Sequence, residues 1–106
     1  MSKQSIANLP ISLDQKKINQ FCQRHQICQL SLFGSVLRED FTEDSDVDFL
    51  VVFDPKNIPG YIRLSAIEME LSELIKRKAD LRTIAELSRY FRQQVQQEAL
   101  TIYVKD

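Results

Sequence analysis

The hydrophobic positions of this chain change their spacing from segment to segment, and the spacing predicts where helices and strands lie. Apolar residues three and four apart predict a helix from about Leu13 to Arg24, with Ser12 and Gln15 at the spacing of a capping box. The same spacing predicts a long amphipathic helix from Tyr61 to Lys78. A last helix is predicted by the stripe of Leu87, Tyr90, Phe91, Val95, Ala99 and Ile102.

Between these helices, extended patterns predict three strands. They cover Ile27 to Phe33, Asp46 to Phe53, and Ala79 to Thr83. The second strand is apolar on both faces after Asp48, so we expect it to be central. A short helix from Ser35 to Arg38 and a polar turn over residues 39–45 connect the first two strands. The pattern predicts an α/β fold of the α+β type, with a small mixed sheet of three or more strands flanked by about four helices.

Length and charge narrow the possible functions. The 106 residues are expected to form one domain over residues 13–106, behind an N-terminal arm of residues 1–12 that lacks periodicity. The 14 basic and 15 acidic residues give a net charge of −1, which argues against general binding of nucleic acid. Cys22 and Cys28 lack metal-ligand spacing, so we expect both to be reduced. Since no stretch has the length of a membrane span, we expect a cytoplasmic protein without membrane contact.

Two carboxylates stand at the head of the predicted central strand. Asp46 and Asp48 are two residues apart, so a strand points both side chains to one face, about 6.5 Å apart along the backbone. Two negative charges at this spacing repel each other unless a cation lies between them. Because Mg²⁺ is a hard ion that favours carboxylate and phosphate oxygens, the pair predicts a magnesium site.

The Gly-Ser step before these carboxylates is a candidate phosphate site. If a helix begins just after the first strand, its free N–H groups attract anions. Gly34 allows the backbone to approach closely, and Ser35 adds a hydroxyl donor. A triphosphate could then lie between these two residues and the metal. Arg38 could reach the phosphates or face solvent.

This combination resembles the polymerase-beta-like nucleotidyltransferases, in which a Gly-Ser step is followed by Asp-x-Asp on the next strand. The matching sequences are Leu-Phe-Gly-Ser, which ends at Ser35, and Asp-Ser-Asp-x-Asp, which ends at Asp48. The whole chain is similar to the minimal nucleotidyltransferases, which serve as antitoxins beside HEPN-domain ribonuclease toxins. It departs from the common pattern at Glu39 and Asp40, where the family often has a glycine. The departure affects the expected conformation of the loop and not the expected chemistry.

The resemblance implies a third carboxylate after the long helix, and Asp80 occupies that place. On a neighbouring strand Asp80 could face Asp46 and Asp48. The resemblance then implies two Mg²⁺ ions held by the three carboxylates and ATP as the substrate, with its β and γ phosphates on Gly34 and Ser35. A hydroxyl would attack the α-phosphate in line, and pyrophosphate would leave.

The identity of that hydroxyl separates three hypotheses. No residues are expected to be available for an acceptor-binding domain, so the acceptor would belong to a separate macromolecule. The resemblance implies a HEPN-type ribonuclease toxin whose tyrosine receives AMP and which thereby loses activity. One alternative is a non-catalytic antitoxin or scaffold subunit that neutralises its partner by contact, and a weaker one is nucleotide transfer to a small molecule. An apolar surface on the last helix could serve a homodimer or a heterocomplex.

Each of these residues also has a purely structural interpretation. Asp46 and Asp48 could form an acidic turn that caps a strand, and the Gly-Ser step could be an ordinary turn. Asp80 could be a solvated residue that pairs with Lys78 or Arg82. The occurrence of both motifs at this spacing favours the catalytic interpretation.

Overall fold

The chain folds around a four-stranded mixed sheet. The structure, a computed structural model, describes residues 9–87 and 89–105. The strands are β1 (Ile27–Phe33), β2 (Val47–Phe53), β3 (Ala79–Arg82) and β4 (Leu100–Val104), in the spatial order β3-β2-β1-β4. β1 is antiparallel to β2 and β4, whereas β2 and β3 are parallel. The predicted α/β fold is confirmed, and its second strand lies inside the sheet.

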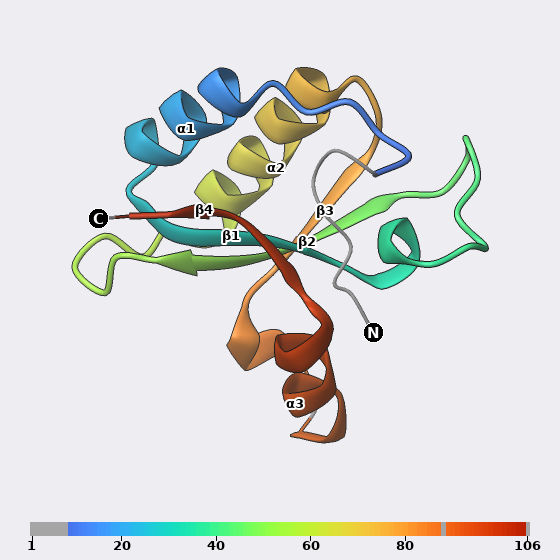
Figure 1. The fold of residues 1–106 in the computed structure, drawn as a ribbon. Coiled ribbons are helices and arrows are strands. Elements are labelled where there is room, and N and C mark those ends of the chain that lie inside the picture. Colours follow the sequence, from blue (N-terminus) through green and yellow to red (C-terminus); the bar gives the residue numbers. More distant parts are fainter. Residues whose placement is uncertain (1–8, 88, 106) are drawn as a thin grey trace.

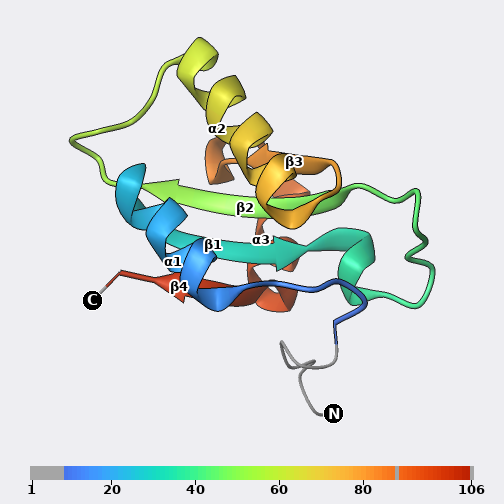
Figure 2. The ribbon, with the colours of Figure 1, turned by 90° about the horizontal axis from the view of Figure 1, so that it is seen from above.

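Helices cover both faces of this sheet. α1 (Gln15–Arg24) and α2 (Tyr61–Ile75) lie on one face, and α3 (Arg89–Glu98) lies on the other (Figure 1, Figure 2). Two short 3₁₀ helices, η2 (Gly34–Leu37) and η3 (Ile84–Glu86), follow β1 and β3. Over residues 9–87 and 89–105, no helix combines the length and the apolar character that crossing a membrane requires.

The main hydrophobic core lies between the sheet and the layer of α1 and α2. Side chains of a strand alternate between its faces, so every second residue of β1 and β2 points to this layer. The core includes Ile18, Phe21, Leu30, Leu32, Phe49, Val51, Ile67 and Leu71. A smaller cluster of Phe33, Leu50 and Val95 lies on the α3 face. Asp48 shares the α3 face with Leu50, because the two residues are two positions apart in β2.

The first helix begins later than the sequence pattern predicts. Its N-cap is Asp14, whose carboxylate accepts hydrogen bonds from the N–H groups of Lys16 (3.1 Å) and Lys17 (3.3 Å). A carboxylate at this position satisfies free amides and interacts favourably with the positive end of the helix dipole. The predicted capping by Ser12 and the predicted start at Leu13 are therefore wrong.

Part of the predicted N-terminal arm packs on the protein. Leu9, Ile11 and Leu13 are partly buried against the main core. Their contacts attach the segment before α1 to the main core. The prediction for residues 1–8 lies outside the described residues.

The second helix ends at Ile75 rather than at the predicted Lys78. Lys76 adopts the left-handed conformation, with φ of 61°, and its N–H donates to carbonyls of the last helical turn. The chain then enters β3, the predicted third strand, whose outer N–H groups are bound by α2. The N–H of Ala79 donates to Ser72 Oγ (2.9 Å), and the N–H of Leu81 donates to the carboxylate of Glu68 (2.8 Å). These bonds cover the outer edge of β3 and fix it beside β2.

The last helix is shorter than predicted, and a strand follows it. α3 ends at Glu98, and Leu100–Val104 forms β4 along β1, so the predicted continuation of the helix to Ile102 is wrong. The apolar spacing of residues 100–104 is compatible with a helix. Pairing with the free edge of β1 satisfies the backbone hydrogen-bonding groups of this segment, so it forms a strand. The side chains of Tyr90 and Phe91, which belonged to the predicted stripe, lie outside the described residues.

An ion-pair cluster joins the two helices on the main face. Glu70 of α2 lies 2.6 Å from the guanidinium of Arg24 and 3.0 Å from Nε2 of His25, at the end of α1. Partial burial raises the pKa of Glu70, but the hydrogen bonds with His25 and Arg24 lower it by more, so its net pKa is below the ordinary value. Glu70 therefore stabilises the packing of α1 against α2 in its charged form.

The cluster predicts a pH dependence of stability. Because folding lowers the pKa of Glu70, its stabilisation is full above the unfolded-state pKa of about 4.3 and is lost as pH falls through the folded-state pKa. Glu70→Gln should be less stable than the wild type at neutral pH, and its stability should fall less between about pH 5 and pH 3. Thermal unfolding of both proteins over this range measures the effect. Parallel stability curves would contradict it.

Candidate active site

Strand register brings the predicted site residues to one end of the sheet. In the parallel pair of β2 and β3, Asp48 lies opposite Asp80. In the antiparallel pair of β1 and β2, Asp48 lies opposite Phe33, the residue before Gly34. Asp48 is therefore flanked on one side by Asp80 and on the other by the Gly-Ser step. All of these residues are at least partly accessible except Phe33.

Gly34 lies directly against the carboxylate of Asp48. Its φ is +79°, a conformation that residues with a side chain rarely adopt. A Cβ atom at this position would lie 2.5 Å from Oδ2 of Asp48, which is closer than van der Waals contact allows. The structure thus needs glycine at residue 34 for two reasons, and one of them is the space that Asp48 occupies.

The Gly-Ser step opens a short helix that begins and ends one residue earlier than the sequence predicts. Gly34 begins η2, a four-residue 3₁₀ helix in which the N–H of Arg38 donates to the carbonyl of Ser35 at 2.9 Å. So short a helix adds little dipole, so any phosphate bound here would depend on individual donors near Gly34 and Ser35. Arg38 is exposed and lies 3.5 Å from Asp40. The structure places Gly34 next to Asp48, and Arg38 at the far end of the same short helix.

The two outer carboxylates each have a cation nearby. Oδ2 of Asp46 lies 3.7 Å from Nζ of Lys78, and Oδ1 of Asp80 lies 3.9 Å from the guanidinium of Arg82. Both cations are largely exposed, and both distances are long for a salt bridge, so these pairs contribute little to stability. Neither pair therefore holds its carboxylate firmly in its present orientation.

The electrostatics of Asp48 show that negative charge is concentrated here. Its pKa is raised, first by burial and then by the nearby charges of Asp80 and Asp46. Arg82 and Arg38 oppose this shift but do not cancel it. A raised pKa at a carboxylate near two others is typical of sites that bind a cation or perform chemistry.

The carboxylates of Asp46, Asp48 and Asp80 are chemically suited to bind a hard divalent cation. Asp48 and Asp80 of two adjacent strands, together with Asp46 just before β2, offer the oxygen ligands that Mg²⁺ prefers, and an ion of this kind relieves their mutual repulsion. Within the part of the chain that the structure describes, no three acidic, histidine or cysteine side chains converge closely enough to hold one ion. Asp46 and Asp80 point toward Lys78 and Arg82, so a shared ion requires their side chains to rotate.

Sequence reasoning left Lys78 and Arg82 out of the site. They lie two residues before and two residues after Asp80, so the period of a strand places all three on one face. This alternation was visible in the sequence as Lys-Ala-Asp-Leu-Arg. Lys78 pairs with Asp46 across the strands rather than with Asp80, and Arg82 also contacts Glu86 at 3.7 Å. The site therefore carries positive charge on β3 as well as negative charge.

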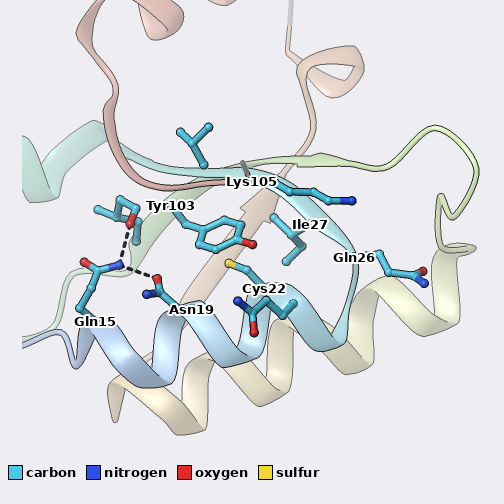
Figure 3. A pocket seen from close by; sticks show the side chains of 10 residues that line it. Gln15, Asn19, Cys22, Gln26, Ile27, Tyr103 and Lys105 are labelled. Carbon is cyan, nitrogen blue, oxygen red and sulfur yellow. Dashed lines mark hydrogen bonds between the residues drawn. The ribbon is translucent and has the colours of Figure 1, made fainter.

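A cleft of about 580 Å³ lies between α1 and β4, at the other end of the sheet (Figure 3). It reaches Ile27, which pairs with Phe53 and so stands at the end of β1 remote from Asp48. None of its ten lining residues is an aspartate, glutamate or histidine. Burial raises the pKa of the Cys22 thiol in this cleft to about 12, so the thiol is not a nucleophile at neutral pH. The cleft does not supply the chemistry that the carboxylates offer.

Comparison with known proteins gives matches over most of the chain. Residues 16–106 match the family described as polymerase beta, nucleotidyltransferase. The chain is 36% identical over 59 residues to a protein adenylyltransferase MntA of Thermococcus cleftensis, which covers 56% of this chain and 58% of the relative. The chain spans less than two thirds of the length of the first curated relatives that it matches.

Solved structures share the architecture of this chain. A proposed minimal nucleotidyltransferase is 29% identical and superimposes with a TM-score of 0.68, over 81% of this chain and 86% of that one. A chain from a complex of a tri-AMPylated Shewanella oneidensis HEPN toxin with an MNT antitoxin is 19% identical, with a TM-score of 0.63, over 86% and 70% of the two chains. At this identity the second match demonstrates a common fold alone.

The contact between Gly34 and Asp48 can be tested by one methyl group. Gly34→Ala should lower the free energy of unfolding by about 1–3 kcal/mol, because the positive φ and the clash both strain the site. It should also displace Asp48 and weaken the binding of Mg²⁺ or Mn²⁺. Chemical unfolding and titration calorimetry measure the two effects.

Gly60→Ala is the matched control for this substitution. Gly60 has φ of −74° and no atom within 4 Å of the position of an added Cβ. The control should change stability by less than about 1 kcal/mol and leave cation binding unaltered. Equal losses in the two variants would show that Gly34 has no special contact.

Proposed function

This chain belongs to the polymerase beta nucleotidyltransferase family, and we propose that it transfers AMP from ATP to a hydroxyl group of a partner protein. The observation that carries the proposal is the position of Asp48. It lies between Gly34 and Asp80, at one end of three adjoining segments. A carboxylate in that position can hold a cation against a phosphate that the Gly-Ser step binds.

The carboxylates would hold the metal ions of the reaction. Asp46 and Asp48 would bind Mg²⁺ on the triphosphate side, and Asp80 would complete a second Mg²⁺ site. When bound, the ions supply neutralisation of phosphate charge and a lower proton affinity of the attacking hydroxyl. The pKa of Asp48, raised by burial, Asp80 and Asp46, supports this assignment because it reports the negative charge that a cation would offset.

The other residues of the site would bind and orient the nucleotide. Gly34 and Ser35 would donate hydrogen bonds to the β and γ phosphates, and Arg38 and Arg82 would add positive charge at the rim. The acceptor oxygen forms a bond to the α-phosphorus on the side opposite the leaving group. The bond between the α-phosphorus and the bridging oxygen breaks, pyrophosphate leaves, and the hydroxyl proton passes to solvent. Positioning and charge complementarity would supply most of the rate enhancement.

We assign the acceptor to a HEPN-type ribonuclease toxin, whose tyrosine would receive AMP and which would then lose activity. This makes the chain the antitoxin of a toxin–antitoxin pair. The similarity to a protein adenylyltransferase and the common fold with an MNT antitoxin support the assignment. The carboxylate end of the sheet supports it too, because Asp46 and Asp80 are partly accessible and a protein side chain can approach them.

The proposal is tested by incubating the protein with the product of the neighbouring gene, α-labelled ATP and Mg²⁺. Labelled AMP should appear on a tyrosine of the neighbour, as detected by mass spectrometry, and the ribonuclease activity of the neighbour should fall. The double substitution Asp46→Asn, Asp48→Asn should reduce labelling by about a hundredfold or more. If both forms silence the partner equally and no label appears, the chain is a contact inhibitor and not an enzyme.

At Asp48 the proposed activity and the stability of the fold are in opposition. Because folding raises its pKa, the charged form costs stability at neutral pH, and this cost disappears below the unfolded-state pKa. Asp48→Asn should therefore unfold at the same or a higher temperature at pH 7 while AMP transfer is lost.

Thermal unfolding and the labelling assay on the same preparation measure both properties. Asp54→Asn, just beyond the other end of β2, is the matched control and should keep transfer. A marked loss of stability in Asp48→Asn would indicate that the carboxylate has a structural role.

A further inference from the structure

Arg77 binds the loop that leads into the candidate site. Its Nη2 lies 3.0 Å from the carbonyl oxygen of Thr42, 2.7 Å from that of Glu43 and 3.3 Å from that of Ser45. The guanidinium also lies over the ring of Phe41, 4.6 Å from its centroid. One side chain thus gathers three backbone carbonyls and an aromatic ring of a single loop.

The charge and exposure of this loop explain why a stabilising contact matters. Residues 39–45 join η2 to Asp46, and they include the exposed acidic residues Glu39, Asp40, Glu43 and Asp44. Like charges in a short segment repel one another, and exposed loops are mobile unless other contacts restrain them. The bonds between Thr42 and Ser45 close a local turn but do not attach it to another element. Among the described residues, the side-chain hydrogen bonds that attach this turn to the rest of the fold all come from Arg77.

Arg77 also lies just before β3, the strand that carries Asp80. It is followed by Lys78, whose carbonyl accepts a hydrogen bond of 2.9 Å from the N–H of Val47. Val47 directly follows Asp46, and Asp80 lies three residues after Arg77. The same short segment therefore fixes Val47, the first residue of β2 and the neighbour of Asp46, against the start of β3, which carries Asp80.

We propose that Arg77 is a positioning residue, which holds the loop 39–45 so that Asp46 keeps its place near Asp48 while the nucleotide reacts. This inference rests on the proposed nucleotidyl transfer for its kinetic consequence, but the attachment of the loop does not. Arginine suits the task because its planar group can donate several hydrogen bonds and stack on Phe41 at once. A lysine would keep the charge and lose the planar group that stacks on Phe41.

The test compares Arg77→Lys and Arg77→Ala with the wild type in hydrogen exchange and in AMP transfer. Both variants should exchange the backbone amides of residues 42–47 faster than the wild type. Both should lower kcat by about tenfold or more, with a smaller change in KM for ATP, because the ligands are misplaced rather than removed. Added methylguanidinium should restore part of the kcat of Arg77→Ala and none of that of Arg77→Lys. Arg63→Lys, on the exposed face of α2, is the control and should match the wild type.

The outcomes separate this inference from the proposed function. Absence of transfer by the wild type would reject the proposed function, and unchanged amide exchange in both variants would reject the attachment of the loop independently. Faster exchange with an unchanged kcat would also overturn the positioning role. Thermal unfolding identifies variants that are unfolded at the assay temperature. If Arg77→Ala is unfolded, Arg77→Lys, which retains the charge, is compared with the wild type in both assays.

Discussion

The parallel pairing of β2 with β3 sets Asp48 beside Asp80, and the rest of the site is arranged around the charge that this pairing concentrates. Repulsion between the carboxylates would push the strands apart if nothing opposed it. The opposition comes from the other face of the same strands, where Val47, Phe49 and Leu81 are buried in the main core. Because strand side chains alternate between faces, burial on one side holds the charged residues in register on the other.

The cations Lys78, Arg82 and Arg77 differ in how firmly they are held by their partners. Lys78 and Arg82 contact carboxylates at 3.7 and 3.9 Å from exposed positions, so their ion pairs are weak and can exchange for other partners. Arg77 instead binds backbone carbonyls, which cannot rotate away from it without moving the loop. The end of the sheet thus combines a backbone held in place with side chains that remain free to reorient. That combination is what a site needs if it is to accept a charged ligand without rearranging the fold.

Most residues of the candidate site could be located in the fold from the sequence, for reasons that particular residues illustrate. Asp46 and Asp48 could be assigned to one face because strand periodicity is a local property, and the long helix before Asp80 allowed that residue to lie on a neighbouring strand. β4 could not be foreseen, because Leu100 to Val104 pairs with β1, about seventy residues earlier in the chain, and such pairing leaves no local pattern. The role of Arg77 could not be predicted from the sequence for a related reason. It acts through carbonyl groups, which every residue has, so no residue type in the loop identifies its partner.

The two faces of the sheet separate the main core from the carboxylates, and this separation bears on the proposed antitoxin activity. The main core and the ion pairs of Glu70 lie on the face of α1 and α2, whereas the carboxylates lie on the α3 face at one end of the sheet. Loss of a carboxylate therefore removes charge from a partly accessible edge without opening a cavity in the core. Surfaces that could bind a partner by contact stay intact in such a variant, so inhibition by contact and inhibition by chemistry are physically separable in this fold. If the proposed partner still binds after the loss of Asp48 but is no longer inactivated, the inactivation depends on the carboxylates.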